Sequence, residues 1–151
     1  MSRAFIKEDV ETFVRSPRRK SATGLPPGAL NYLTADGAQE LRARLTRLES
    51  AADRDEATIS HLEHVLASAT IVDPQTSWDE VLFGTAVTLQ TATGELERYR
   101  IVGVDEVHLQ PGNVSWVSAV GKTLLGAQRG QRVKFADEEV GIRTVVSIDD
   151  R

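Results

Sequence analysis

The stretch that decides the fold is LTADGAQELRARLTRLESAADRDEATISHLEHVLASA, residues 33–69. Its first half carries an apolar stripe at helical spacing, formed by Leu41, Leu45, Leu48 and Ala52. Its second half carries another such stripe, formed by Ile59, Leu62, Leu66 and Ala69. The polar stretch DRDEA between the two stripes has room only for a tight reversal. The segment therefore predicts an antiparallel helical hairpin.

The ends of both helices have recognisable signals. Thr34 is the expected N-cap of the first helix, and Leu33 and Ala38 stand where a hydrophobic staple would place them. A helix from about Thr34 to Ala52 would be roughly 28 Å long. The second helix is expected to end at Asp73-Pro74, because the residue before a proline avoids the helical region.

Beyond the hairpin, residues 78–148 change to a period of two and to β-branched residues, which is typical of strands. One pair of strands is expected in FGTAVTLQTA and ERYRIVGV around the turn at Thr93-Gly94, and another in QRVKFA and GIRTVVSI around DEE. VSWVS predicts a short strand after Pro111-Gly112-Asn113, and Ser118 to Ala127 has a helical pattern. The fold class expected is α+β: a short hairpin followed by an antiparallel sheet domain with one short helix.

The triplet Gly121-Lys122-Thr123 resembles the end of a phosphate-binding P-loop. The complete pattern needs a glycine five positions earlier, where this chain has Trp116. No apolar strand leads into a glycine-rich turn here, so the triplet is interpreted as one turn of a helix that covers the sheet.

Charge divides the chain unevenly around its net value of −4. Residues 1–30 contain six basic and three acidic residues, giving +3, and the other 121 contain 12 basic and 19 acidic residues, giving −7. The first 30 residues are rich in Pro, Gly, Ser and charge, so they are predicted to form a disordered basic tail. Such a tail suits an acidic partner and also a solubilising role.

Other features narrow the class of protein. The chain has no cysteine and no run long enough to span a membrane, which favours a cytoplasmic protein without disulfides. His61 and His64 stand three apart, so one helix face could hold both as two ligands of a metal ion, or both could face solvent. The expected organisation is a tail (1–30), the hairpin (31–74) and the sheet domain (75–151).

Several blocks of the chain, taken in order, resemble the GreA/GreB family of bacterial transcription elongation factors. YLTADGAQELRARLTRL is similar to the opening of the family's hairpin, and FGTAVTL, ERYRIVGVDE and VSWVSAVGKTLLGAQRGQRV are similar to successive blocks of its C-terminal domain. The resemblance covers residues 31 to about 148, and MSRAFIKE is similar to the start of a short-hairpin, tailed subgroup grouped with GreB and related to Rnk. It implies an FKBP-like fold for residues 75–151.

The resemblance also implies a partner and a role. Family members bind RNA polymerase at its secondary channel, and acidic residues at the tip of a long coiled coil help to hold a catalytic Mg²⁺ while the polymerase cleaves its own RNA. A protein of this kind is not itself an enzyme, needs no cofactor of its own, and meets nucleic acid, including DNA, through the elongation complex. The resemblance therefore implies regulation of transcription elongation.

Two segments correspond to the acidic hairpin tip and the polymerase-docking strip of the family. The hairpin tip carries Asp53, Asp55 and Glu56 beside Arg54, in a hairpin much shorter than that of the cleavage factors. The carboxylates could assist Mg²⁺, or Asp55 and Glu56 could simply favour the start of the second helix. The segment aligned with the polymerase-docking strip is Ser115, Trp116, Val117, Ser118 and Ala119, followed by Lys122. Trp116 could anchor a partner or lie buried beneath the short helix.

The limited reach of the hairpin favours a factor that binds RNA polymerase and modulates elongation without efficient transcript cleavage. Three alternatives stay open: tip-stimulated cleavage, an Rnk-like regulator of nucleoside diphosphate kinase, and a prolyl isomerase. The last follows from the implied fold alone, which is a weak basis for a function.

Overall fold

The structure is a computed structural model that describes residues 25–26, 28–74, 76–135 and 141–149. The chain divides into two compact units, Met1–Leu30 and Asn31–Arg151. Nearly all of the first unit, and with it the predicted basic tail, lies outside the described residues. The expected DEE turn between the last two strands also lies outside them.

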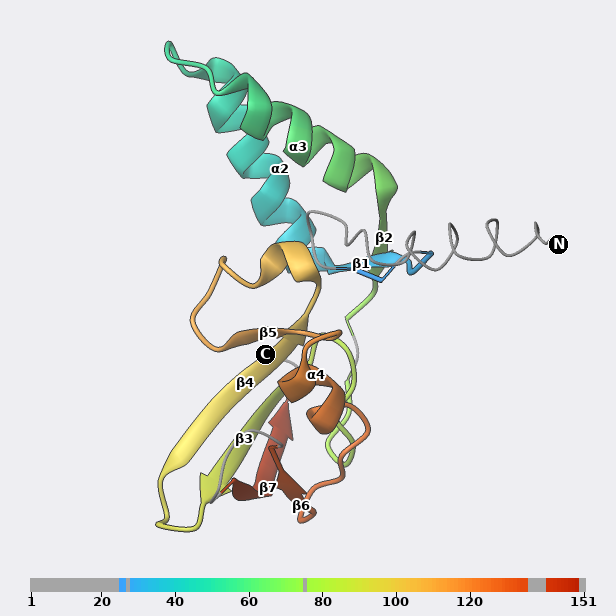
Figure 1. The fold of residues 1–151 in the computed structure, drawn as a ribbon, viewed down its shortest axis with the longest axis vertical. Coiled ribbons are helices and arrows are strands. Elements are labelled where there is room, and N and C mark those ends of the chain that lie inside the picture. Colours follow the sequence, from blue (N-terminus) through green and yellow to red (C-terminus); the bar gives the residue numbers. More distant parts are fainter. Residues whose placement is uncertain (1–24, 27, 75, 136–140, 150–151) are drawn as a thin grey trace, which may run out of the picture. The chain divides into compact units, whose positions relative to one another are not determined.

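The second unit begins with a helical hairpin between two short strands (Figure 1). The strands pair in parallel, with Asn31 opposite Ala69 and Thr34 opposite Val72, so both ends of the hairpin meet in one ladder. Thr34 caps the first helix as predicted: its side chain accepts a hydrogen bond from Gly37 N. The elements are β1 (Asn31–Thr34), α2 (Ala35–Ser50), α3 (Glu56–Ser68) and β2 (Ala69–Val72).

The apolar stripes pack α2 against α3, as the sequence indicates. The buried cluster of the hairpin consists of Leu33, Ala38, Leu41, Leu62 and Val65, with Leu45, Leu48 and Leu66 partly buried around it. Leu33 and Ala38, the predicted staple pair, are both fully buried in this cluster. On α3 the stripe is centred differently from the prediction, since Val65 rather than Leu66 faces inward.

The predicted end of the second helix at Asp73-Pro74 is wrong. The helix ends at Ser68, and the next four residues form β2. Thr70, Ile71 and Val72 are β-branched, a type that prefers extended backbone, and β1 supplies them with a ladder partner. The helical pattern of the sequence runs on into this strand because Ala69, its last apolar position, suits either structure.

The rest of the unit is a five-stranded sheet in the order β5-β4-β3-β7-β6. The turn at Thr93-Gly94 joins β3 to β4 as expected, and Gly94 has a φ of +92°, which favours glycine. A register shift at Thr88/Leu89 interrupts the pairing of β3 with β7. The strands are β3 (Ala86–Thr91), β4 (Leu96–Val102), β5 (Asn113–Ser115), β6 (Arg132–Lys134) and β7 (Ile142–Asp149).

The α+β class is confirmed, but the sheet is not wholly antiparallel. β5 runs parallel to β4, with Arg100 opposite Asn113 and Val102 opposite Ser115. Residues 103–112, which include the 3₁₀ helix η2 (Val104–Glu106), carry the chain back before β5 begins. Parallel neighbours need such a crossover, and a sequence pattern of alternating residues does not reveal the direction of a strand.

The sheet has its own core on the face covered by α4 (Ala119–Leu124). This short helix lies within the segment for which the sequence predicted one, and Ser118 caps it. Its Leu124 is fully buried with inward-facing residues of the strands, namely Val87, Leu89, Ile101, Val133 and Val145. The burial of Leu124 confirms that the GKT triplet belongs to a packing helix.

Candidate functional site

The predicted docking strip forms a tight turn between β5 and α4. Ser118 fixes it: its hydroxyl donates to the Ser115 carbonyl at 2.6 Å and accepts from Gly121 N at 3.0 Å. The hydroxyl of Ser115 accepts from Val117 N at 3.2 Å. Both serines are therefore occupied by local bonds, and the side chains left facing outward are those of Ala119 and Lys122, which are exposed.

Gly121 is required here by packing. A Cβ on this residue would lie 2.0 Å from the Ser115 carbonyl oxygen and 3.1 Å from Trp116 Cα. Any side chain would therefore push α4 off the turn that its N-cap holds. The glycine of the GKT triplet is explained by this close approach and not by phosphate binding.

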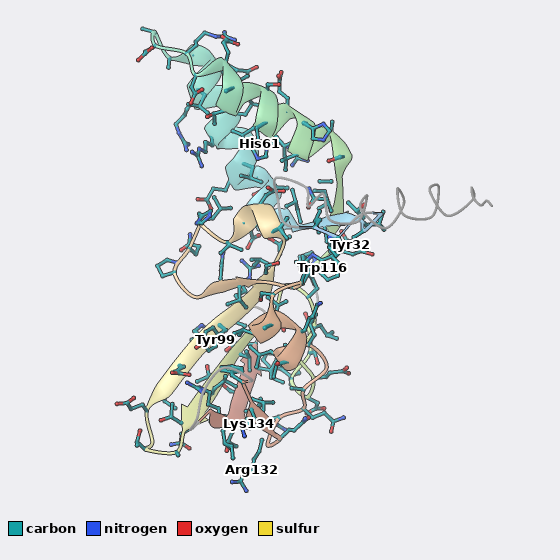
Figure 2. The ribbon with its side chains drawn as sticks, viewed as in Figure 1. Tyr32, His61, Tyr99, Trp116, Arg132 and Lys134 are labelled. Carbon is teal, nitrogen blue, oxygen red and sulfur yellow. The ribbon has the colours of Figure 1, made fainter. Side chains whose placement is uncertain are left out.

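Trp116 lines an apolar cleft beside the docking turn. The cleft has a volume of about 360 Å³ and is lined by Tyr32, Val72, Leu82, Phe83, Trp116 and Leu125. The ring of Tyr32 meets Trp116 edge-on at 5.3 Å between centroids and lies 6.0 Å from Phe83. Figure 2 labels Tyr32 and Trp116 side by side. Trp116 is partly exposed, so it is neither a free surface residue nor fully buried.

The cleft is mainly hydrophobic, with one orphan donor in its wall. The indole nitrogen of Trp116 is buried and has no hydrogen-bond partner in the described structure. A buried N–H without an acceptor is uncommon in folded proteins. An aromatic cleft of this kind is suited to an apolar side chain.

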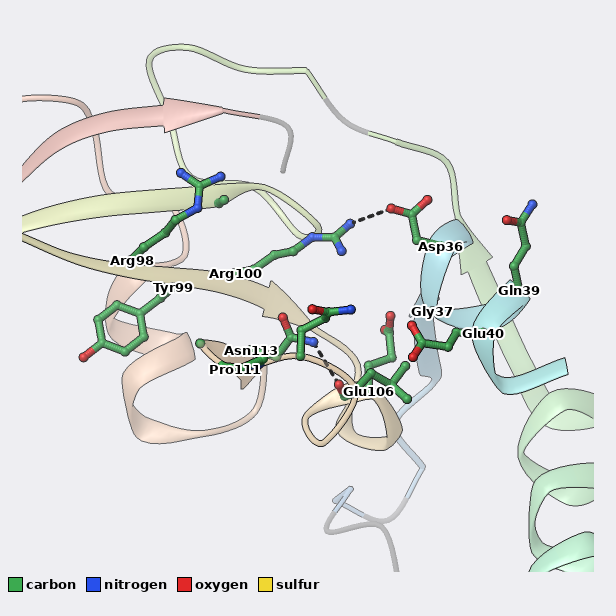
Figure 3. Close-up of a pocket in the computed structure, with 14 residues that line it drawn as sticks. Asp36, Gly37, Gln39, Glu40, Arg98, Tyr99, Arg100, Glu106, Pro111 and Asn113 are labelled. Atoms are coloured by element: carbon green, nitrogen blue, oxygen red, sulfur yellow. Dashed lines mark hydrogen bonds and ion pairs between the residues drawn. The ribbon is translucent and has the colours of Figure 1, made fainter. Parts of the chain in front are cut away.

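A buried carboxylate, Glu106, joins the base of the hairpin to the sheet (Figure 3). Its Oε2 accepts from Thr34 N at 3.0 Å and from Gly103 N at 2.8 Å, and its Oε1 accepts from Thr34 Oγ1. Burial raises the pKa of Glu106, and these hydrogen bonds partly oppose the rise. Thr34 Oγ1 also accepts from Gly37 N, so a hydrogen-bond chain runs from α2 through the cap to Glu106.

The first turn of α2 lies directly against this carboxylate. A Cβ at Gly37 would fall 1.7 Å from Glu106 Oε1, so a side chain there would displace the carboxylate from its hydrogen bonds. Alongside, Arg100 pairs with Asp36 at 3.6 Å and donates to the Gly84 carbonyl at 3.0 Å. Asp36, Gly37, Arg100 and Glu106 border a polar cleft of about 730 Å³. The arginine and the buried glutamate hold the hairpin base to the sheet, which fixes where the hairpin starts.

The hairpin tip carries its three acidic residues within one reversal, all exposed. Asp55 caps α3, accepting from Thr58 N at 3.1 Å and from its hydroxyl at 2.6 Å, and these bonds lower the pKa of Asp55. Glu56 pairs with Arg54 at 2.7 Å, a contact that raises the pKa of the arginine. Among the described residues, no three His, Cys, Asp or Glu side chains are grouped to hold a metal ion.

Residues 75–150 match the family model described as Transcription elongation factor, GreA/GreB, C-term. The match takes in every strand of the five-stranded sheet, the docking turn and α4. The chain belongs to the GreA/GreB family.

Individual GreA/GreB relatives match over about half of their length. GreA of Desulfovibrio desulfuricans is 39% identical over 80 residues, which cover 52% of this chain and 49% of the relative. GreA of Novosphingobium aromaticivorans is 39% identical over 95 residues (62% and 55%). GreB of Neisseria meningitidis is 34% identical over 77 residues (50% and 47%). This chain therefore spans about half the length of the relatives that it matches.

Solved structures of the same family show a looser likeness. A GreA/GreB factor from Nitrosomonas europaea is 21% identical, with a TM-score of 0.43 over 80% of this chain and 98% of that one. Gfh1 of Thermus thermophilus, a GreA homologue, is 27% identical, with a TM-score of 0.41 over 80% and 99%.

The predicted tip residues lie together in the structure, and so do the predicted docking residues. The two sets lie at different places in the fold. Asp53, Asp55 and Glu56 lie at the α2–α3 reversal, while the docking residues lie at the β5–α4 turn. Reasoning from sequence missed the other walls of the apolar cleft and missed Glu106. The spacing of Tyr32 and Phe83 gives no sign that they meet Trp116, because they come from distant segments.

None of the helices in the described residues has the length and apolar character needed to cross a membrane.

Proposed function

We propose that this chain is a transcription elongation factor that binds RNA polymerase at the secondary channel and regulates DNA-templated elongation without efficient transcript cleavage. Membership of the GreA/GreB family supports the general role. The proposal makes the protein a regulator and not an enzyme, and it places the protein in the cytoplasm with its partner. Any Mg²⁺ involved would belong to the polymerase.

The proposed lack of efficient cleavage rests on the contacts that the tip carboxylates already make. Asp55 uses both oxygens on Thr58, and Glu56 is paired with Arg54. A carboxylate that assists Mg²⁺ must give its lone pairs to the ion, so helix capping and ion pairing compete with that use. Arg54 also brings a positive charge to the place a cation would have to enter.

The length of the hairpin supports the same conclusion. α2 has 16 residues and α3 has 13. At about 1.5 Å per residue these helices are roughly 24 Å and 20 Å long. A hairpin of this length carries its acidic tip only a short way from the β1–β2 ladder.

The docking surface proposed is the apolar cleft with the adjoining turn at Ser115–Lys122. A partly exposed tryptophan beside two aromatic rings is the kind of residue that dominates the binding energy of an interface. Lys122, exposed on α4, would contact the rim of the interface.

The test of docking is co-purification with core RNA polymerase, quantified by fluorescence anisotropy. Trp116→Ala is expected to weaken binding by roughly 30-fold or more, the effect of losing a residue worth about 2 kcal/mol. Trp78→Ala is the matched control, because Trp78 is 59% exposed and lies outside the cleft. Equal losses in the two variants, or no binding of the original chain at low salt, would refute the docking proposal.

A second assay separates elongation control from cleavage. Arrested elongation complexes incubated with this protein are expected to change their rate of elongation without releasing short 3′ RNA fragments. Cleavage stays the second candidate because Asp53 is exposed at the tip. Fragment release that disappears in Asp53→Ala or Asp55→Ala would favour it. Failure to bind polymerase, with an effect on nucleoside diphosphate kinase, would instead favour the Rnk-like role.

A further inference from the structure

The strand β6 forms one edge of the five-stranded sheet, where it pairs with β7 on a single side (Figure 1). Gln131, just before it, accepts a hydrogen bond from β7 at 2.9 Å, and Phe135, just after it, donates one to the residue preceding β7 at 3.3 Å. In an antiparallel pair, such positions alternate with positions whose backbone groups point away from the partner strand. The N–H and C=O groups of Arg132 and Lys134 therefore point off the edge of the sheet.

The side chains of the same two residues bring positive charge to this edge (Figure 2). Val133 between them is buried in the core that α4 covers, so Arg132 and Lys134 lie on the opposite face of the sheet. Both are exposed, and no carboxylate among the described residues forms an ion pair with either. Alternate residues of a strand stand roughly 6.6 Å apart, so two like charges follow the edge at this spacing.

A cleft of about 230 Å³ lies beside these two side chains. In the register of the sheet, Thr144 stands opposite Arg132, and Ile142 stands opposite Lys134. Gln90 of β3 pairs with Thr144 from the other side and completes the row. Ile142 is 43% exposed, and none of the residues that line the cleft is acidic. The cleft therefore offers an apolar contact next to cationic, hydroxyl and amide donors.

We propose that the β6 edge binds an extended acidic segment of a partner protein, which adds a strand to the sheet and sets carboxylates at alternate positions against Arg132 and Lys134. In this mode of recognition the backbone hydrogen bonds supply affinity, and the alternate side chains supply specificity. Opposite charges directly across two strands stabilise the pairing. The methylene groups of a glutamate would lie against the exposed side of Ile142.

Two other roles for these charges fit the edge less well. Lysine and arginine on an edge strand can serve only to discourage pairing, but that role makes no use of a cleft beside them. Single-stranded nucleic acid would need aromatic rings for base stacking, and no aromatic residue lines this cleft. A phosphodiester backbone also has no donor for the outward C=O groups of β6, whereas a peptide backbone has both donors and acceptors.

The position of β6 separates this inference from the proposed docking of polymerase. The two edges of the sheet are β5 and β6, and the docking turn follows β5. A segment bound at β6 would leave the edge at β5 unoccupied. The inference therefore stands whether or not the protein binds polymerase.

The experiment titrates the full chain at low salt with a short peptide in which glutamate and valine alternate, followed by NMR of the backbone amides. We expect the amide signals of Arg132, Lys134 and Thr144 to shift, and that of Val114 on the opposite edge to stay unchanged. The same peptide N-methylated on the amides that would face β6 is expected to bind roughly 10-fold more weakly, because it lacks those donors. A peptide of the same composition with its glutamates adjacent is expected to bind several-fold more weakly.

Substitutions test the charges. Arg132→Glu is expected to weaken binding of the acidic peptide by roughly 5-fold or more. Arg129→Glu is the matched control, because it reverses the same charge at a 58% exposed position outside β6. The double change Arg132→Glu with Lys134→Glu should bind a peptide in which lysine replaces the glutamates. Such an exchange of preference also shows that the variant is folded.

Several results would overturn the proposal. Equal binding of the parent and N-methylated peptides would exclude strand addition, and equal losses in Arg132→Glu and Arg129→Glu would exclude a specific role of β6. An absence of shifts with the acidic peptide would leave the charges with the role of discouraging pairing. If a short single strand of DNA shifted these amides and the peptide did not, the edge would be a nucleic-acid site instead.

Discussion

Replacing Glu106 tests the reasoning about the base of the hairpin most directly. This carboxylate is 1% exposed and accepts hydrogen bonds from Thr34 N, Thr34 Oγ1 and Gly103 N. Glu106→Ala removes every acceptor at once and leaves both backbone N–H groups without their hydrogen-bond partner. The hairpin would lose the tie that holds its N-cap.

The size of the effect follows from those donors. Leaving a buried donor unsatisfied costs about 1–3 kcal/mol, so two backbone N–H groups cost about 2–6 kcal/mol together. Glu106→Gln keeps the volume and one oxygen that can accept from both backbone N–H groups, and its NH₂ would face the Thr34 hydroxyl in place of Oε1. Its cost is expected to be about half as large.

Urea unfolding followed by circular dichroism measures these differences. Glu95→Ala is the control, because Glu95 is an exposed carboxylate in the β3–β4 turn. We expect Glu106→Ala to lower the midpoint strongly and Glu95→Ala to leave it within error. A loss below about 1 kcal/mol for Glu106→Ala would mean that the donors find other partners, and the account of the tie would be wrong.

The same carboxylate gives a pH test with a defined sign. Burial raises the pKa of Glu106 above its ordinary value of 4.5, so the folded chain keeps this proton to a higher pH than the unfolded chain does. The stability that the proton contributes is complete below about pH 4.5 and is lost as the pH rises through the folded pKa. Glu106→Gln lacks this proton. The difference in unfolding free energy between the original chain and the variant should therefore be most favourable to the original chain at acid pH.

Three further predictions concern other contacts. Gly121→Ala should destabilise the sheet domain by about 1–3 kcal/mol, since its Cβ would lie 2.0 Å from the Ser115 carbonyl; a midpoint unchanged in urea would contradict the packing account. Asp55→Ala should reduce helicity by circular dichroism, and because the pKa of Asp55 is lowered, the loss should shrink as the pH falls below the ordinary value of 3.8. Glu97→Gln should cost stability above about pH 4.5 and progressively less below it, because the hydrogen bond from Arg143 lowers the pKa of Glu97; a loss independent of pH would show that the negative charge of Glu97 contributes nothing to stability.

Local signals in the sequence predicted the elements that depend on local chemistry. Thr34 and Ser118 cap the helices because a short hydroxyl side chain satisfies the first free amides, and that preference acts within one turn. The leucine stripe of α2 likewise needs only helical spacing. The turn at Thr93-Gly94 was predictable from the freedom of glycine to adopt a positive φ.

The features that were missed depend on contacts between distant residues. β2 follows α3 without a break, and its strand character is set by the partner β1 and not by its own neighbours in sequence. The direction of β5 depends on where the crossover returns. In the sequence, Glu106 looks like an ordinary acidic surface residue. Only the fold shows that it is buried against Thr34, which lies 72 positions earlier. The apolar cleft was missed for the same reason, because its aromatic rings come from three separate segments.

The parallel ladder of β1 and β2 allows the length of the α2–α3 hairpin to change while its base stays the same. β1 leads into the hairpin and β2 leads out of it, and the two strands pair side by side. Equal insertions in α2 and α3 would therefore lengthen the hairpin and move its tip away from this ladder. Seven extra residues in each helix, two turns that keep the leucines nearly in phase, would add about 10 Å. A graded series of such chains would test whether the distance between the ladder and the acidic tip decides the effect of the protein on elongation.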